Sequence, residues 1–377
     1  MRVLHVMECT IGGTRRHLVD AVLGQRAAGL DVHVTASNLR QADFEEDLAR
    51  LESAGAVVTR LPMVRAIDPA RDAAHLAFLR RGLERARPDV VHTHSSKAGV
   101  LGRLASVATD VGARVHTPHT FAFLFEAEFS RPKRALFRAI ERGLSGHTRA
   151  MIAVSPSEGR TFTASGVVDA ERVRVVPNGI DPAPWLRARA VPRSELGVPT
   201  GATLAVVVGL LNVAKGQDLA IEALARPDLA HVHLLVVGHG ALEPELRELA
   251  RRVRVAERVH FLGFRRDVPA LIAAADFLIL PSRWEGMPYA VLEAMASARA
   301  VVATPVDGAR DLVESEGTGI LCASIDAASI AAGVRRVLDL GVDGRARMGE
   351  HARERLLARH TAATMVRGLI DVYREVA

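Results

Sequence analysis

Short apolar runs alternate with longer amphipathic stretches along this sequence, and this alternation most limits the fold. RVLHVM at residues 2–7 is typical of a buried strand, Gly12-Gly13 is typical of a turn, and residues 15–29 have helical spacing that ends at Gly29. Further strand-like runs follow as DVHVTAS, AVVTRLPM, DVVHTH, ARVHTPH, MIAVS and VRVVPNG. Strands that alternate with helices predict a parallel sheet with helices on both faces.

A proline-rich segment separates two halves of the chain. Residues 181–201 contain four prolines and little apolar periodicity, which is typical of a linker. After this segment the alternation restarts, with strand-like runs TLAVVVGLL, HVHLLVVG, VHFLG, DFLILPS and AVVATPV. The final amphipathic stretch, MVRGLIDVYREV, has no strand after it, so we expect it to pack back on the first half.

The sequence therefore predicts an α/β protein with two similar domains. We expect residues 1–182 and 361–377 in the first domain, 183–199 in the linker and 200–360 in the second domain. A length of 377 residues agrees with two domains of ordinary size. Ligands of parallel sheets bind beyond the carboxyl ends of the strands, so we expect a site in a cleft between the domains.

Composition excludes several classes of protein. Cys9 and Cys322 are too few to hold this fold by disulfides, and no Cys-x-x-Cys pair is present to bind zinc. Two Trp and two Tyr provide no aromatic platform for single-stranded nucleic acid. The net charge of +6 fits a phosphate-bearing partner or simply an arginine-rich background, because only three of the 49 basic residues are lysines. No apolar run reaches the ~18–20 residues of a membrane span, and the N-terminus has no signal-peptide pattern, so we expect a cytoplasmic protein.

The segment PSRWEGMPYAVLEAMA has the pattern of an anion site. Pro288 suits the first position of a helix, which leaves the backbone amides near Gly286, Met287 and Tyr289 without partners inside that helix. Amides at a helix start, with the helix dipole behind them, bind phosphates.

Two carboxylates flank this predicted helix start. Glu285 precedes it and Glu293 lies inside the helix. Carboxylates repel phosphate but accept hydrogen bonds from hydroxyl groups, so the layout suits a ligand with hydroxylated groups on either side of a diphosphate. A surface glutamate and a helix-face glutamate remain the alternative.

Two turns follow predicted strands at the same edge. Lys215 and Gly216 occupy a strand-to-helix turn, where an ammonium group can neutralise a leaving diphosphate. A solvated turn lysine is the alternative, but lysine is rare in this chain. Gly12 and Gly13 allow close approach of the backbone to a ligand, or form a plain tight turn.

Histidines cluster after two strands of the first half, in HTHSSKAG and VHTPHTF. His92 and His94 share one face of a strand, but no carboxylate or cysteine nearby completes a metal site, so we expect no metal. His119 is best placed to orient a substrate hydroxyl. His92 and His116 are expected to be structural.

One helix carries a basic stripe. In RPKRALFRAIERGL, the apolar positions Leu136, Ile140 and Leu144 form one row, and the cations Lys133, Arg134, Arg138 and Arg142 lie beside it. Such a helix suits peripheral contact with an anionic membrane, and equally the solvated face of an ordinary helix.

In their order and spacing these features resemble the retaining GT-B glycosyltransferases of family 4, also called group 1. The resemblance covers essentially the whole chain and rests on the two halves, the early Gly-Gly, VVPNGID, AKG, DVPALIAAADFLILPSRWEGMP and the spacing of Glu285 and Glu293. It implies two Rossmann-like domains that face each other across a cleft, with the last helix crossing back to the first domain. It also implies sugar transfer from a nucleotide sugar, with retention and without a required metal.

The resemblance assigns roles to individual residues. It implies that His119, Lys215 and Glu285 are catalytic. It implies donor contacts by Gly12, Gly13, Phe264, Arg265, Gly286, Met287, Pro288 and Glu293, with Glu293 on the ribose and Phe264 and Arg265 near the base. For the acceptor it points to His17, Ser96 and Lys97.

One position departs from the family pattern. The family commonly has GRLxxxKG, and this chain has GLLNVAKG, with Leu210 in place of the arginine. A preorganised charge contact contributes roughly 3–4 kcal/mol to transition-state stabilisation. Either Arg283 or Arg265 replaces it, or the chain binds the donor and turns over slowly. Asp311, where glutamate is frequent, is a milder departure.

The expected function is transfer of a sugar, with a UDP-sugar favoured, to a hydroxyl acceptor in exopolysaccharide or capsule synthesis. A sugar or lipid-linked acceptor is expected, and nucleic acid is not. The alternatives are a non-catalytic nucleotide-sugar binder and a transferase for small molecules. The sequence leaves open the sugar, the nucleotide and the acceptor.

Overall fold

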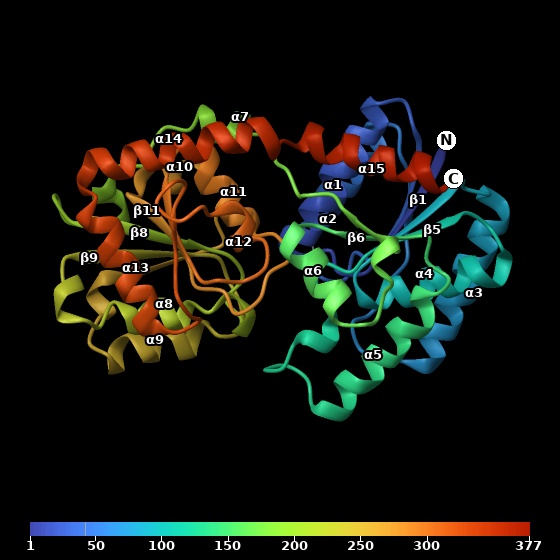
Figure 1. Cartoon of the computed structure of the whole chain (residues 1–377), viewed down its shortest axis with the longest axis horizontal. Coiled ribbons are helices and arrows are strands. Elements are labelled where there is room, and N and C mark those ends of the chain that lie inside the picture. Colours follow the sequence, from blue (N-terminus) through green and yellow to red (C-terminus); the bar gives the residue numbers. More distant parts are fainter. Residues whose placement is uncertain (42) are drawn as a thin grey trace. The chain divides into compact units, whose positions relative to one another are not determined.

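The chain folds into two units, each built on one parallel sheet. The computed structural model describes residues 1–41 and 43–377. The first unit contains Met1–Asn178 together with Ala362–Ala377, and the second contains Gly179–Thr361 (Figure 1).

The sheet of the first unit has the strand order β3-β2-β1-β4-β5-β6-β7, and all neighbours are parallel. Its strands are β1 Arg2–Met7, β2 Asp31–Ala36, β3 Val57–Arg60, β4 Val90–His94, β5 Ala113–Thr117, β6 Ala150–Ala153 and β7 Val173–Val175. This order places the topological switch point between β1 and β4, where doubly wound folds bind their ligands.

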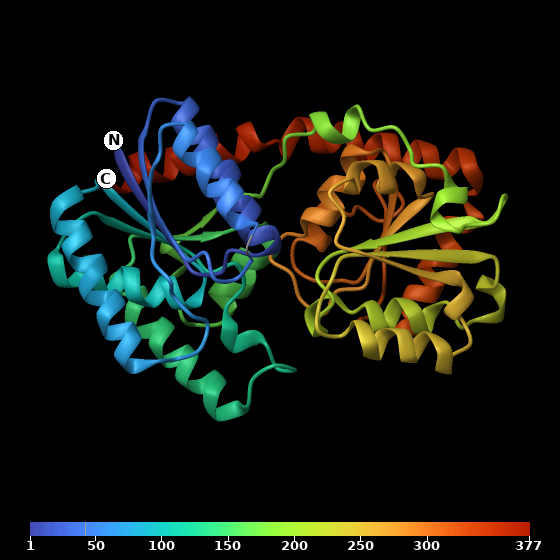
Figure 2. The ribbon, with the colours of Figure 1, turned by 180° about the vertical axis from the view of Figure 1, so that it is seen from behind.

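Helices cover both faces of this sheet (Figure 2). They are α1 Gly12–Ala27, α2 Phe44–Ser53, α3 Pro69–Ala86, α4 Ser96–Thr109, α5 Arg131–Ser145, α6 Pro156–Ala164 and α15 Ala362–Val376. Val3 and Met7 of β1 pack on α1, α2 and α15, whereas Leu4 and Val6 pack on α3 and α4. The alternation along the strand thus separates the two layers.

Helix α15 completes the first unit, as the sequence predicted. Its side chains Leu369 and Tyr373 are fully buried against α1 and the sheet. Gly24 of α1 permits this approach, because a Cβ there would lie 2.4 Å from Val366 Cγ2.

The second unit repeats the architecture, with strand order β10-β9-β8-β11-β12-β13 and parallel neighbours throughout. Its strands are β8 Thr203–Val208, β9 Val232–Val237, β10 Val259–Gly263, β11 Phe277–Leu280, β12 Ala300–Ala303 and β13 Ile320–Leu321. Its helices are α7 Ala183–Leu186, α8 Gln217–Ala223, α9 Glu243–Arg252, α10 Val268–Ala274, α11 Tyr289–Ala296, α12 Ala309–Leu312, α13 Ala327–Asp339 and α14 Gly341–Arg359. The switch point lies between β8 and β11.

The segment 183–199, expected as a linker, folds as part of the second unit. Trp185, Leu196 and Val198 are buried there, and α7 contacts α10 and α11. The prolines stop a strand or long helix from forming, but the apolar residues between them still find a core.

None of the helices in the described part of the chain combines the length and the apolar character that a bilayer span requires.

Candidate functional site

The loops after β8 and β11 meet at the switch point of the second unit. The backbone N–H of Arg283 donates to the backbone carbonyl of Ala214 at 2.8 Å, and this hydrogen bond joins the two loops. Lys215 Nζ donates to Glu285 Oε1 at 2.7 Å, and Ser282 Oγ donates to the same oxygen at 2.7 Å. The two residues that the sequence assigned to catalysis in this half are therefore ion-paired.

The backbone around Lys215 is shaped for this contact. Asn212 Oδ1 accepts from the Lys215 amide at 3.2 Å and fixes a 3₁₀ turn, Val213–Lys215. Gly216 then adopts φ 65°, and a Cβ there would lie 2.1 Å from the Pro281 carbonyl oxygen. Glycine is required at this position because the two loops touch through their backbones.

The Lys215–Glu285 pair is partly exposed, with side-chain exposures of 29% and 10%. An ammonium group in this setting keeps a face toward solvent while a carboxylate fixes its position. A bound anion can share this ammonium group, and a hydroxyl group can donate to the Glu285 carboxylate.

Helix α11 starts beside this pair, one residue later than predicted. Pro288 has ψ 116° and is the N-cap, so the first helical residue is Tyr289 rather than Pro288. Gly286 and Met287 precede the cap, and the Gly308 loop packs on them, where a Cβ would lie 2.4 Å from the Gly286 carbonyl oxygen. Amides at the start of α11 lie at the positive end of the helix dipole, as an anion site requires.

Glu293 lies within α11 and is partly exposed. Glu285 lies in the loop before this helix, so the two predicted carboxylates belong to the same unit. The proposed division of their contacts between two hydroxylated groups stays a prediction.

Phe264 and Arg265 follow β10. Phe264 is 54% exposed, and its ring contacts His239 edge to face with centroids 5.7 Å apart. The Arg265 guanidinium donates to Asp267 at 2.7 Å and 2.6 Å. An exposed ring at this edge suits stacking on a base.

Both arginines that were expected to replace the cation absent at Leu210 are ion-paired within the second unit. Arg283 donates to Asp218 Oδ1 at 2.9 Å and to the Val213 carbonyl at 3.0 Å. Asp218 and Asp267 raise the pKa of Arg283 and Arg265, respectively, by accepting hydrogen bonds from them.

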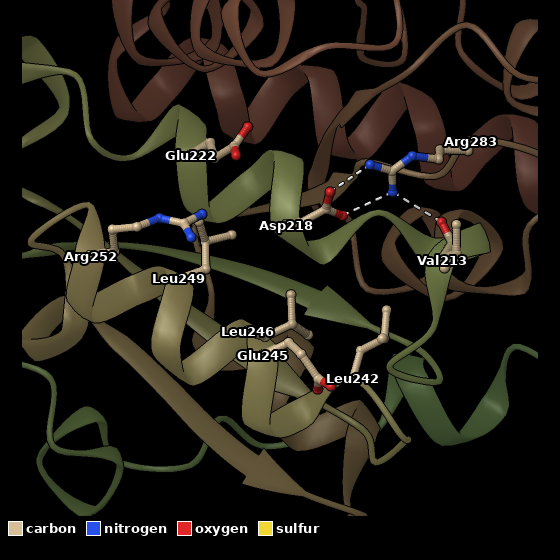
Figure 3. A pocket seen from close by; sticks show the side chains of 9 residues that line it. All are labelled: Val213, Asp218, Glu222, Leu242, Glu245, Leu246, Leu249, Arg252 and Arg283. Carbon is tan, nitrogen blue, oxygen red and sulfur yellow. Dashed lines mark hydrogen bonds and ion pairs between the residues drawn. The ribbon is translucent and has the colours of Figure 1, made fainter. Parts of the chain in front are cut away.

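A surface hollow lies between α8 and α9, where Figure 3 shows Arg283 paired with Asp218 at its edge. It is lined by Val213, Asp218, Glu222, Leu242, Glu245, Leu246, Leu249, Arg252 and Arg283. Its lining holds three acidic side chains and two arginines, and one of these arginines, Arg283, is paired with Asp218.

In the first unit, several loops at the carboxyl edge contain left-handed residues. Gly12 has φ 51° after β1, Ser95 has φ 59° after β4, and His119 and Thr120 have φ 53° and 75° after β5. Two consecutive non-glycine residues in this region cost of order 1–3 kcal/mol each, so surrounding contacts must impose the conformation.

Glu158 imposes the left-handed conformation on the turn after β5. This buried carboxylate accepts from the Thr120 amide at 2.8 Å and from the Val154 amide at 2.7 Å. Glu158 was not among the residues predicted for the site. Its signal was the Ser-x-x-Glu spacing of a capping box at the start of α6, where Ser155 accepts from the Glu158 amide at 3.1 Å.

His119 heads a chain of buried imidazoles. Its Nε2 lies 3.3 Å from His94 Nδ1, and His94 Nε2 lies 2.9 Å from His5 Nδ1. His5 Nε2 donates to Gln25 Oε1 at 2.8 Å. The Gln25 amide oxygen can only accept a hydrogen bond, so His5 carries its proton on Nε2. His94 and His119 then also carry their protons on Nε2, because each donates to the next histidine in this hydrogen-bonded row.

This row of hydrogen bonds continues to Tyr373 in the last helix, α15. Gln25 donates to the Tyr373 hydroxyl at 3.2 Å, and Tyr373 donates to His92 Nδ1 at 2.6 Å. His92 Nε2 then donates to Thr117 Oγ1 at 2.8 Å. His92 is thus a structural residue, as expected, and so is His116, which is buried and bonds to Thr93.

The three predicted acceptor contacts differ in accessibility. Ser96 is exposed at the start of α4. Lys97 donates to Asp72 at 2.6 Å and 2.5 Å, and its side chain is only 10% exposed. The His17 imidazole is fully buried and bonds to Asn178, so it belongs to the interior of the unit.

The basic helix α5 has a mostly exposed surface. Leu136 is 50% exposed and Arg142 is exposed. The other predicted cations have partners within the chain: Lys133 lies 4.5 Å from the Phe129 ring centroid, Arg134 donates to Glu126, and Arg138 donates to the Ser165 carbonyl.

Comparison with known proteins decides the family. Residues 11–184 match the family described as Glycosyltransferase Family 4, and residues 202–340 match Glycosyl transferases group 1. The chain is 30% identical over 288 residues to the UDP-Gal:alpha-D-GlcNAc-diphosphoundecaprenol alpha-1,3-galactosyltransferase of Escherichia coli, covering 74% of this chain and 73% of that protein. The chain belongs to glycosyltransferase family 4.

Other relatives agree with this family. The D-inositol 3-phosphate glycosyltransferase of Salinispora arenicola is 32% identical over 311 residues, covering 76% of this chain and 68% of that protein. Among solved structures, HepE of Anabaena in complex with UDP and glucose matches with a TM-score of 0.81 at 23% identity, covering 100% of both chains. The sucrose-phosphate synthase of Thermosynechococcus elongatus matches with a TM-score of 0.83 at 19% identity, covering 100% of this chain and 99% of that chain. These structures support the GT-B fold of this glycosyltransferase.

Proposed function

We propose that this glycosyltransferase moves a sugar from a UDP-sugar to a hydroxyl group of a lipid-linked acceptor, with retention at the anomeric carbon. The observation that carries the proposal is the Lys215–Glu285 ion pair beside the start of α11. A cation and a helix start suit the diphosphate of the donor, and Glu285 and Glu293 suit hydroxyl groups of its sugar and ribose.

The donor class is supported by the named relatives. The galactosyltransferase of Escherichia coli is described with UDP-Gal as donor, and HepE was crystallised with UDP-glucose. The exposed Phe264 ring provides a surface on which a base could stack.

The chemistry follows from where charge develops. Glycosyl transfer passes through an oxocarbenium-like state, which puts positive charge on the sugar and negative charge on the departing diphosphate. Lys215 and the amides at the start of α11 stabilise the negative charge in our proposal, without a metal ion. The acceptor hydroxyl attacks from the face that the diphosphate leaves, and a phosphate oxygen takes its proton.

Lys215→Ala tests whether Lys215 stabilises the departing diphosphate. We expect kcat to fall by roughly 10²–10³-fold, because a preorganised charge contact is lost, with little change in the KM for the acceptor. Release of UDP from UDP-glucose and UDP-galactose measures this. Arg251→Ala, at an exposed arginine of α9, is the matched control.

An equal loss in kcat and in acceptor affinity would contradict the role of Lys215. Unchanged activity in EDTA supports the absence of a required metal at the diphosphate, and a loss that Mg²⁺ or Mn²⁺ restores opposes it. The anomeric proton coupling of the product reports retention or inversion.

A lipid-linked acceptor is supported by the diphosphoundecaprenol acceptor in the name of the Escherichia coli relative. The exposed face of α5 offers a surface for such a lipid, with Arg142 and Leu136 on it. Replacing Arg131 and Arg142 by Glu should reduce binding to anionic vesicles by at least about 30-fold, since each basic side chain near the surface contributes about 1 kcal/mol. Sedimentation with phosphatidylglycerol vesicles measures it, and neutral phosphatidylcholine vesicles are the control.

Two other functions are favoured by specific observations. A small acceptor is favoured by the D-inositol 3-phosphate glycosyltransferases among the relatives. A non-catalytic donor binder is favoured by Leu210 and by the pairing of Arg283 and Arg265. Thermal stabilisation by UDP-sugars without UDP release in any acceptor mixture would identify the binder.

A further inference from the structure

A hydrogen-bonded row of side chains leads from the interior of the first unit to His119. Gln25 of α1, His5 of β1 and His94 of β4 form its inner part, and all three are fully buried. His5 Nε2 lies 2.8 Å from Gln25 Oε1, and His5 Nδ1 lies 2.9 Å from His94 Nε2. His94 Nδ1 then lies 3.3 Å from His119 Nε2. Four separate segments of the chain therefore build this row, and His119 is its outer end.

Neighbouring rings of the row lie nearly in one plane. The ring planes of His5 and His94 meet at 19°, and those of His94 and His119 also meet at 19°. The ring centroids of these two pairs are 5.2 Å and 5.6 Å apart. Imidazole nitrogens donate and accept in the plane of the ring, so the rings are joined edge to edge. Each ring therefore constrains the orientation of the next.

Gln25 gives the row its direction. Its amide nitrogen donates to the Tyr373 hydroxyl at 3.2 Å, and its amide oxygen faces His5. Since this oxygen only accepts, each imidazole of the row donates through Nε2 and accepts through Nδ1. The protons of His5, His94 and His119 therefore all lie on Nε2.

The outer end of the row presents a hydrogen-bond acceptor. His119 uses its Nε2 inside the row, and no described residue forms a hydrogen bond with its Nδ1. The side chain of His119 is partly exposed, in contrast to the fully buried His5 and His94. A lone pair on His119 Nδ1 is therefore available to a hydroxyl group that approaches from outside the unit.

We propose that Gln25, His5 and His94 are positioning residues for sugar transfer. They hold His119 as the neutral tautomer with its proton on Nε2, so that His119 Nδ1 accepts a hydrogen bond from a hydroxyl group of the substrate. This inference rests on the proposed transferase function and on the predicted contact of His119 with a substrate hydroxyl.

The neutral state of the rings agrees with such a row. Burial lowers the pKa of His5 to about 4, and it lowers the pKa of His94 and His119 well below the usual value. A protonated imidazole has two donors and no acceptor, so a charged ring would interrupt the row. Neutral rings are therefore what a row with a single direction requires.

Two variants of His94 with side chains of nearly the same shape test this role. His94→Asn and His94→Leu both lose the hydrogen bond to His5, but an asparagine oxygen can still accept from His119 Nε2 and leucine cannot. We expect kcat for UDP release from a UDP-sugar to fall about 10-fold in His94→Leu, with little change in the KM for the donor. His94→Asn should recover most of this loss. If His94 only filled space, leucine would be the better substitute, because it leaves no polar group unpaired in the interior.

The tautomer of His119 is measured without any transferase activity. Proton–nitrogen correlation spectra of the full-length protein with isotope-labelled histidine show which ring nitrogen carries the proton, and His119→Gln assigns the signals. We expect His119 to be protonated on Nε2 in the unmodified protein and in His94→Asn, and to be a mixture of both tautomers in His94→Leu. The exposed His147 should give the same signals in all variants.

Gln25→Met removes the acceptor at the inner end of the row and keeps an unbranched side chain of similar length. It should produce the same mixture of His119 tautomers, so it tests the row even where His94→Leu fails to fold.

Two results would overturn the proposal. One is His119 protonated on Nδ1 in the unmodified protein, because the row would then run in the opposite direction. The other is a kcat in His94→Leu equal to or above that in His94→Asn. Failure of the proposed function is distinct from both, since the unmodified protein would then release no UDP while the spectra would still report the tautomer.

Discussion

Single charged residues decide which ion pairs form at the carboxyl edge of the second unit's sheet. Lys215 is one of three lysines in the chain, and it is the one that pairs with Glu285. Its occurrence in a background of arginine agrees with a need for a compact ammonium group. The pairing of Arg283 with Asp218 was not predictable, because these residues are 65 positions apart and many arginines compete for each carboxylate.

Glu158→Gln tests the turn that holds His119. The variant keeps the size of the side chain but loses the charge that two backbone amides share, so the free energy of unfolding should fall by about 1.5–3 kcal/mol. Urea denaturation followed by circular dichroism measures this.

Glu171→Gln, which changes an exposed glutamate in the same unit, is the control for loss of charge. Equal stability of the two variants would show that Glu158 does not impose the left-handed turn. If His119 contacts the sugar, Glu158→Gln should also lower kcat, and the Glu171 variant should not.

At the scale of elements, periodicity predicted the strands and helices well, and sequence reasoning placed His92 and His94 on one face. The first and last residues of helices and strands were less predictable. Pro288 suits either the N-cap or the first helical position, and contacts made by the Gly308 loop lie beyond any local pattern. The buried network of His5, Gln25 and Tyr373 joins segments up to 348 residues apart, so no spacing in the sequence reveals it.

Gly308→Ala tests the support beneath the start of α11. A Cβ there would lie 2.4 Å from the Gly286 carbonyl oxygen and 2.5 Å from Met287 Cα, so this backbone must shift. We expect a several-fold higher Kd for a UDP-sugar and lower stability than in Gly201→Ala.

Gly201 is the control, because its φ of 82° is also positive and no atom lies within 4 Å of the added Cβ. A side chain at a positive φ costs of order 1–3 kcal/mol in each variant. Isothermal titration with UDP-glucose and thermal unfolding separate the two effects, and identical behaviour of both variants would contradict the supporting role of Gly308.

At the scale of the whole molecule, buried histidines make stability depend on pH. Burial lowers the pKa of His5 to about 4 and that of His116 well below its usual value of 6.5. Between pH 4 and pH 6.5, a histidine such as His5 is protonated in the unfolded chain and neutral in the folded chain. Stability is therefore complete above pH 6.5 and is lost as the pH falls toward 4.

Urea unfolding at pH 7.5 and pH 5 measures this, and we expect each such histidine to contribute of order 1–2 kcal/mol to the difference. His5→Gln should reduce the dependence on pH, whereas His351→Gln, at an exposed histidine, should leave it unchanged.

The placement of α15 has a consequence for synthesis of the chain. The first unit needs the last sixteen residues, Ala362–Ala377, which leave the ribosome after the entire second unit. Until then, the nascent chain carries an uncovered apolar strip along α1 and the neighbouring sheet, at the sites that Leu369 and Tyr373 later fill. Completion of this unit must therefore await synthesis of α15, and until then the polypeptide should depend on chaperones that shield such surfaces.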